Sequence, residues 1–172
     1  MTSLQKSHSM LKNRHIRPVV PDSRRGWFHL PSEKAKLCLN PAESTLYRLF
    51  LAHPEGLLSD DLVLHWDELW GIYAHESRFD DPALREDALV SLCSESKRVF
   101  YSNIARIKRK FVEAIGARKA KGYYIKRYPN GLYRTLATIT PSTPLSQHPA
   151  QNPCSRHSTR SPSDYIAASS GR

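Results

Sequence analysis

The segment 97–115 constrains the fold of this chain more than any other. Its apolar residues Phe100, Ile104, Ile107, Phe111 and Ile115 fall within a narrow arc when successive residues are placed about 100 degrees apart. This spacing predicts an amphipathic helix that buries one side against other elements. The glycine that follows the segment predicts where the helix ends.

The opposite side of the same helix is cationic. Ser102, Arg106, Arg109 and Lys110 lie opposite the apolar arc. Burial of the isoleucines would therefore leave a positively charged outer face, which is the geometry of a helix that reads nucleic acid.

Upstream, two further patterns predict helices. A short strand is predicted at Leu37-Cys38-Leu39. A helix is predicted to begin at Asn40-Pro41-Ala42-Glu43, which provides a cap, a first-turn proline and a capping-box glutamate, and to end near His53. The stripe Leu62, Trp66, Leu69 and Tyr73 predicts a second helix, with Ser59 as its cap.

Two more elements complete the predicted order. Asp80-Asp81-Pro82 starts a third, shorter helix within 76–96. Downstream of the cationic helix, the stretch 123–136 carries two strand patterns around Pro129-Asn130-Gly131, and Asn-Gly is a strong hairpin signal. The sequence thus predicts a mainly helical α+β domain with a C-terminal hairpin.

The ends of the chain differ in composition from its centre. We expect a flexible basic arm over 1–26, one folded domain over 27–138, and a disordered tail over 139–172 that is rich in serine, threonine and proline. A chain of 172 residues has room for one domain of this size.

Charge is separated along the domain. The stretch 55–95 contains eleven acidic and two basic residues, whereas 97–135 contains one acidic and twelve basic residues. Together with a net charge of +10, this predicts a basic half that is attracted to phosphates and an acidic half that is repelled by them.

The order of these elements resembles the OmpR/PhoB-type winged helix-turn-helix, the output domain of many response regulators. The similarity runs from Leu37 to Leu136 and is carried by Leu37-Cys38-Leu39-Asn40-Pro41-Ala42-Glu43, by His53-Pro54-Glu55-Gly56, by 104–111, and by Gly131-Leu132-Tyr133-Arg134. We expect no receiver domain beside this winged helix, and the segment before the cationic helix is longer than in that family.

The resemblance implies a transcriptional regulator that binds duplex DNA. It would place the recognition helix 97–115 in a major groove and the wing 123–136 on the backbone and minor groove. The residues expected to contact DNA are Ser102, Asn103, Arg106, Arg109, Lys110, Lys126, Arg127, Asn130 and Arg134.

Two other functions are compatible with the same sequence. The acidic segment 55–95 could serve a winged-helix adaptor as its protein-binding surface. Tyr123, Tyr124, Tyr128 and Tyr133 could stack on unpaired bases in an RNA-binding module, although tyrosines at strand spacing more often pack a hairpin onto its helices.

The sequence contains no motif for catalysis. His65-Trp66-Asp67-Glu68 and His75-Glu76 offer imidazoles and carboxylates but match neither His-Glu-x-x-His nor a triad, so we interpret them as helix surface. We therefore expect no enzyme, no cofactor and no metal site. The absence of a long apolar run and of a signal-peptide pattern predicts a cytoplasmic protein with no membrane partner.

Overall fold

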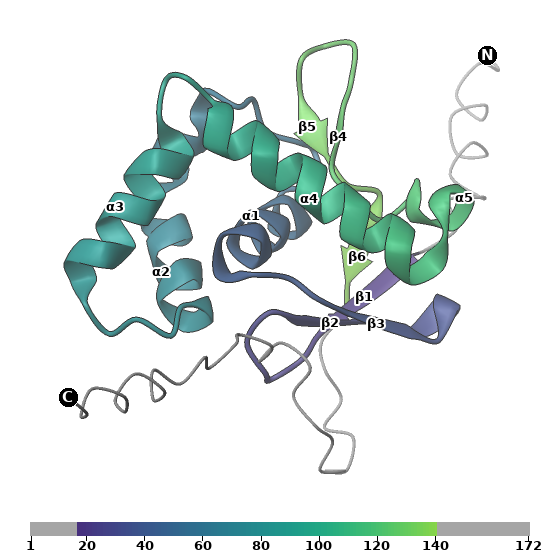
Figure 1. Ribbon diagram of the computed structural model, residues 1–172. Helices are drawn as coiled ribbons and strands as arrows, with labels where there is room; N and C mark the ends of the chain where they lie inside the picture. The colour runs from purple at the N-terminus through teal and green to yellow at the C-terminus, as the bar shows by residue number, and fades with distance from the viewer. Residues whose placement is uncertain (1–16, 141–172) are drawn as a thin grey trace, which may run out of the picture.

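The computed structural model describes residues 17–140, which form a mainly helical α+β fold (Figure 1). A four-stranded sheet lies on one side of the helices, and a separate two-stranded hairpin projects beyond them. The helices are α1 (Pro41–Ala52), α2 (Trp66–Glu76), α3 (Pro82–Cys93), α4 (Arg98–Ile115) and the short α5 (Ala117–Ala120), with 3-10 turns η1 (Pro31–Glu33) and η2 (Asp61–His65).

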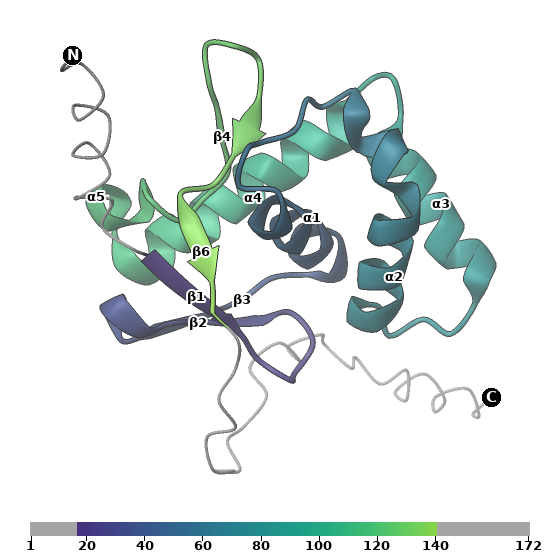
Figure 2. The same ribbon diagram turned by 180° about the vertical axis from the view of Figure 1, so that it is seen from behind.

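The sheet joins the two ends of the described chain. Its order is β3-β2-β1-β6, in which β1 pairs antiparallel with β2 and parallel with β6 (Figure 2). Val19 of β1 is fully buried and lies opposite Ile139. The strands are β1 (Arg17–Pro21), β2 (Trp27–Leu30), β3 (Ala35–Cys38), β4 (Lys126–Arg127), β5 (Tyr133–Arg134) and β6 (Ala137–Ile139).

The boundaries predicted for the domain, residues 27 and 138, are therefore wrong, since regular structure extends beyond both of them. Residues 17–26 form β1 and the turn after it, and Ile139 is the last residue of β6. Directly after β6, the amide of Thr140 donates to the carbonyl of Val19 at 3.0 Å. Prolines 18 and 21 suggest a non-regular arm, but proline is tolerated at strand ends. Residues 1–16 of the predicted arm and 141–172 of the predicted tail lie outside the described residues.

The start of α1 matches the prediction from sequence. The Asn40 side chain accepts from the amide of Glu43 at 2.9 Å, and the Glu43 carboxylate accepts from the amide of Asn40 at 3.0 Å, which makes a complete capping box. Pro41 occupies the first turn. This local chemistry fixes the position at which α1 leaves the sheet.

The second predicted helix differs at its start. Ser59 does not cap it, since the chain first winds as the 3-10 turn η2, and α2 begins at Trp66. The tighter winding buries Leu62 completely while it leaves Val63 and Leu64 exposed. The predicted helix at Asp81-Pro82 is confirmed as α3, where Asp81 accepts from the amide of Ala83.

The core lies between α1, α4 and the sheet. Tyr47 of α1 contacts Phe28 of β2 edge to face at 5.2 Å between ring centroids, and Phe111 of α4 stacks on Tyr123 at 6.0 Å. The hydroxyl of Tyr47 donates to the carbonyl of Tyr123 at 2.9 Å. Because these contacts fix α4 through its buried side, its opposite side faces outward.

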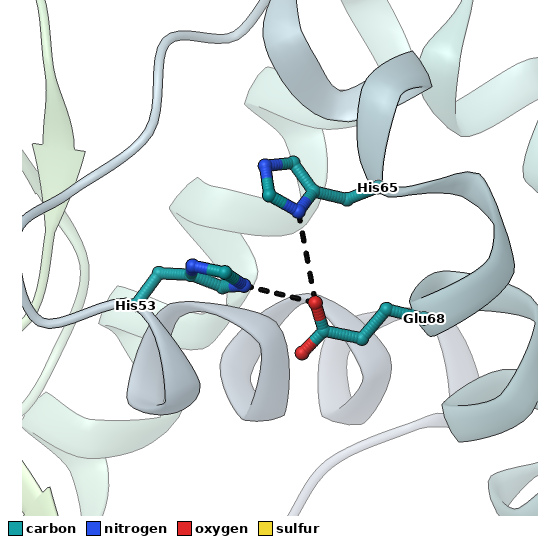
Figure 3. A group of neighbouring side chains, drawn as sticks. All are labelled: His53, His65 and Glu68. Carbon is teal, nitrogen blue, oxygen red and sulfur yellow. Dashed lines mark hydrogen bonds and ion pairs between the residues drawn. The ribbon is translucent and has the colours of Figure 1, made fainter.

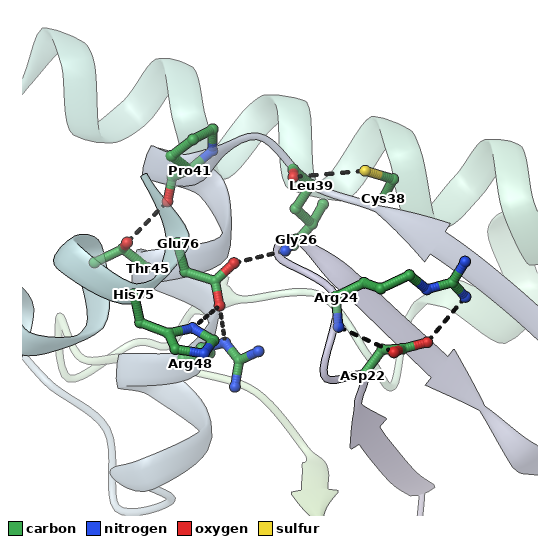
Figure 4. Close-up of polar contacts among 10 residues, drawn as sticks. All are labelled: Asp22, Arg24, Gly26, Cys38, Leu39, Pro41, Thr45, Arg48, His75 and Glu76. Atoms are coloured by element: carbon green, nitrogen blue, oxygen red, sulfur yellow. Dashed lines mark hydrogen bonds and ion pairs between the residues drawn. The ribbon is translucent and has the colours of Figure 1, made fainter. Parts of the chain in front are cut away.

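A buried carboxylate joins the helical part to the sheet (Figure 4). Glu76, at the end of α2, accepts from the amide of Gly26 at 2.6 Å, and its other oxygen lies 2.7 Å from Arg48 Nε in an ion pair that is not aligned as a hydrogen bond. Figure 4 shows Glu76 reaching from α2 toward the turn that connects β1 to β2. The contact ties this turn to the helices.

Within residues 17–140, no helix is both long and apolar enough to cross a membrane.

Candidate nucleic-acid interface

The outward side of α4 is built as the apolar spacing predicts. Phe100, Ile107 and Phe111 are fully buried, and Ile104 and Ile115 are half-buried. Ser102 and Arg106 are exposed on the other side, and Arg106 forms no ion pair within the described part of the chain. The helix therefore presents a polar, cationic face to solvent.

Arg109 is exposed on the same face and has a neighbour of opposite charge. Its Nε lies 3.5 Å from Glu113 Oε1 one helical turn later, and both side chains are about two-thirds exposed. Exposed pairs of this kind contribute little free energy. Arg109 is therefore free to exchange Glu113 for another anion.

Asn103 of the predicted interface lies on α4 but is turned into the protein. Asn103 is 3% exposed, and its side-chain amide donates to the carbonyl of Val99 at 2.9 Å, so the expected contact with DNA is wrong. Asn103 lies at the edge of the apolar arc, and the bond to the preceding turn satisfies its amide inside the protein.

Lys110 is occupied by a structural ion pair. Its Nζ lies 2.5 Å from Glu43 Oε2, the carboxylate of the capping box, which is almost completely buried. Lys110 therefore connects α4 to the start of α1 rather than pointing away from the fold. The partner lies in a distant part of the sequence, so helical periodicity gives no sign of it.

The predicted hairpin is present as β4 and β5. Its turn closes through the amide of Gly131, which has a φ of +82° and donates to the carbonyl of Tyr128, while Asn130 Oδ1 accepts from the amide of Leu132 at 3.3 Å. Asn130 is exposed at the tip, but this turn bond uses its oxygen. The hairpin is anchored by two bonds between Leu57 and Tyr133, at 3.0 and 2.8 Å.

Three cationic side chains come from the hairpin. Lys126 and Arg134 lie directly opposite each other in the register, and Arg127 is exposed. The Arg134 guanidinium carbon lies 4.1 Å from the centre of the Tyr128 ring, a cation–π contact that orients this side chain.

A further group of cations lies where the hairpin meets α4. Lys108 Nζ and Lys126 Nζ lie 5.6 and 5.4 Å from the centre of the Tyr124 ring, so one half-buried ring contacts lysines from both elements. Burial lowers the pKa of Lys126, and the nearby charges of Arg17 and Lys121 lower it further. We name Arg17, Lys108, Lys121 and Lys126 the basic cluster.

The sequence prediction missed three members of the basic cluster. Arg17 precedes the predicted domain, and Lys108 lies at the flank of the α4 wheel. Lys121 lies between the predicted helix 97–115 and the predicted hairpin 123–136. The Arg17 guanidinium can lie against residue 122 because this residue is glycine; a Cβ at this position would collide with the guanidinium. A glycine beside a lysine-rich stretch is the only sequence signal for this approach.

Most of the positive charge in this region is not neutralised. Of the twelve basic residues in 97–135, only Lys97, Arg109, Lys110 and Lys119 form ion pairs with carboxylates within residues 17–140. The remaining eight lie on α4, α5, the hairpin and the segment between them. This arrangement can bind a polyanion along two adjacent elements.

Comparisons of the chain with protein-family models, with curated proteins and with solved structures found no match.

Proposed function

We propose that this protein binds duplex DNA in the manner of a winged helix-turn-helix, and that it acts as a transcriptional regulator. In this proposal the outward face of α4 enters the major groove, and the β4–β5 hairpin contacts the adjacent backbone and minor groove. The observation that carries the proposal is the set of basic residues on α4 and the hairpin that form no ion pair with a carboxylate within residues 17–140: Arg98, Arg106, Lys108, Lys126, Arg127 and Arg134.

Contacts to phosphate and contacts to bases would come from different residues. The basic cluster and Arg127 would bind phosphates, since their ammonium and guanidinium groups attract the backbone without reading sequence. Arg106 and Arg109 would reach base edges, because they are exposed near the middle of the helix face.

The order of elements supports this docking. The longest helix, α4, follows the shorter helices α1, α2 and α3 and precedes a hairpin, an order that is compatible with this DNA-binding motif. The bonds between Leu57 and Tyr133 hold the hairpin beside the helices. Two of the four tyrosines that could have stacked on single strands, Tyr123 and Tyr133, are buried. Their burial favours duplex DNA over unpaired RNA.

Two exposed apolar side chains support the alternative of a protein-interaction adaptor. Val63 and Leu64 of η2 are 56% and 78% exposed within the acidic segment 55–95, and exposed apolar side chains of this kind are typical of protein contacts. An adaptor would not require the cations of α4.

The test is fluorescence anisotropy with a 20-base-pair duplex of mixed sequence across 50–300 mM KCl. About six phosphate contacts predict a slope of about −5 for log affinity against log salt. The variant K108A/R127A removes two of the proposed phosphate contacts, both from exposed side chains. It should reduce the magnitude of this slope by about two and weaken binding at least about tenfold at 100 mM KCl.

The matched control is R25A/R78A, which removes the same charge from two exposed side chains outside α4 and the hairpin. It should leave the slope unchanged within error. A flat salt response of the wild-type chain, equal losses in both variants, or tighter binding of single-stranded RNA than of the duplex would contradict the proposal.

A further inference from the structure

Three side chains from consecutive elements meet beside the start of α2 (Figure 3). His53 follows the last residue of α1, His65 is the last residue of η2, and Glu68 lies in the first turn of α2. One nitrogen of each imidazole and one carboxylate oxygen all lie within 4.8 Å of one another. We name these three residues the His-His-Glu cluster.

Both imidazoles of the His-His-Glu cluster face the same carboxylate. His53 Nε2 lies 2.9 Å and His65 Nδ1 3.6 Å from Glu68 Oε2, and the two rings meet at an angle of 65° with centroids 4.5 Å apart. Figure 3 shows the two nitrogens pointing toward this oxygen from different sides.

These separations are close to those that a bound ion imposes. In a tetrahedral zinc site, metal–ligand distances of about 2.0–2.2 Å place neighbouring ligand atoms roughly 3.3 Å apart. The two measured separations between histidine and glutamate fall on either side of that value. Shifts of about 1–1.5 Å in the side chains would therefore bring all three atoms into one coordination sphere.

A fourth residue orients the first histidine. His53 Nδ1 lies 3.0 Å from Glu55 Oε1, on the side of the ring away from Glu68. A proton on Nδ1 that is donated to Glu55 leaves the lone pair of Nε2 directed at the His-His-Glu cluster. Histidine ligands of metal ions are held by carboxylates in this way.

The surroundings of the His-His-Glu cluster admit a cation. The side chains of His53 and His65 are 22% and 25% exposed, and that of Glu68 is 37% exposed, so an ion can enter and keep a bound water. The stretch 55–95 also contains eleven acidic against two basic residues, which attracts positive charge to this half of the molecule.

We propose that His53, His65 and Glu68 bind one divalent transition-metal ion, with zinc as the best match to two imidazoles and one carboxylate. Magnesium and calcium prefer all-oxygen sites, so they fit this ligand set poorly. Three protein ligands leave the fourth position to water. The ion would join the end of α1 to η2 and the start of α2, and it would stabilise the segment that carries Val63 and Leu64.

The test uses the full chain after removal of metal with EDTA. Titration with ZnCl2, followed by calorimetry, should give one site with a Kd of 10 µM or tighter. CoCl2 should give the visible absorption of a tetrahedral nitrogen–oxygen site. A hundredfold excess of zinc over its Kd should raise the Tm by about 5–10 °C.

Variants distinguish this site from other histidines of the chain. H53Q, H65Q and E68Q should each weaken zinc binding at least about tenfold, and E55Q should weaken it by about ten- to a hundredfold through loss of the bond that orients His53. The control is H75Q, which removes an imidazole that is 59% exposed on α2, outside the His-His-Glu cluster. It should bind zinc like the wild type.

Circular dichroism and the Tm without metal show whether each variant folds. If a histidine variant does not fold, the zinc affinity of E68Q tests the proposal instead. The proposal is overturned if the wild-type chain binds neither Zn²⁺ nor Co²⁺ below 100 µM. It is also overturned if folded H53Q/H65Q, or folded E68Q, binds zinc as tightly as H75Q.

Discussion

Two adjacent residues of α4 have different roles although both are basic. Lys110 contacts the buried carboxylate of Glu43, whereas Arg109 contacts the exposed Glu113. Removing one member of an ion pair with a buried partner destabilises the fold, because it leaves a buried charge without compensation. An exposed pair contributes little, so its arginine is available to a ligand.

This difference predicts opposite effects for two matched substitutions. Lys110→Met should lower the free energy of unfolding by about 1–3 kcal/mol, because Glu43 then keeps only the amide of Asn40. Arg109→Met should lower it by less than about 0.5 kcal/mol but weaken DNA binding more than Lys110→Met does. Urea unfolding and anisotropy measure the two effects. Equal stability of the two variants would contradict the assignment of Lys110.

Asp22 gives the fold a dependence on pH. Burial opposes its ionisation, but hydrogen bonds from Arg24 and His29 outweigh burial and hold the pKa of this carboxyl below its usual value. A lowered pKa in the folded state stabilises the fold above the unfolded pKa of about 3.9, and this stabilisation is lost as the pH falls through the folded pKa.

We therefore expect Asp22→Asn to lower the free energy of unfolding by about 1–3 kcal/mol at pH 7. The difference between variant and wild type should shrink when the pH falls below about 4, where the wild-type carboxyl becomes protonated in the unfolded chain. Urea unfolding at pH 7, 5 and 3 measures it. A difference that stays constant with pH would argue against a contribution from the charge of Asp22.

At the scale of elements, the sequence predicts correctly those helices and turns that are determined by residues close together in the chain. The capping box at Asn40 and Glu43, the proline at the start of α3, and the spacing of Phe100, Ile107 and Phe111 each act within a few residues. The sequence therefore predicted α1, α3, α4 and the position of the hairpin turn.

The elements that the sequence missed depend on distant partners. Strand β1 is short and contains Pro18 and Pro21, and it becomes a strand because it pairs with β2 and with β6 at the other end of the described chain. The same holds for the interface and for the His-His-Glu cluster. Arg17 reaches Gly122, Lys110 reaches Glu43, and His53 reaches Glu68 across separate elements.

The role of β1 can be tested with one pair of substitutions. Val19→Ala should lower the free energy of unfolding by about 2 kcal/mol, because it removes apolar groups from a fully buried position in the sheet. Val20→Ala, at the half-buried neighbouring position, is the control and should have about half that effect or less. Thermal and urea unfolding measure both. If residues 17–21 were a mobile arm, neither substitution would change the free energy of unfolding.

At the scale of the whole molecule, the separation of charge predicts how the protein approaches DNA. The acidic half opposes binding in any orientation that turns it toward the phosphates, and the basic half favours the orientation in which α4 and the hairpin face them. Glu86 and Asp87 of α3 are exposed and form no ion pair within residues 17–140. In the proposed complex α3 does not contact DNA, so their charge would act on it only at a distance.

Neutralising these two carboxylates should therefore strengthen DNA binding without adding a contact. We expect E86Q/D87N to raise affinity for a mixed duplex by about two- to threefold at 50 mM KCl, mainly through faster association. The gain should disappear near 300 mM KCl, where screening acts over about 6 Å. Stopped-flow association at both salt concentrations measures it. A gain that persists at high salt would indicate a direct contact of α3 with DNA, and a loss of affinity would show that the acidic half takes part in binding.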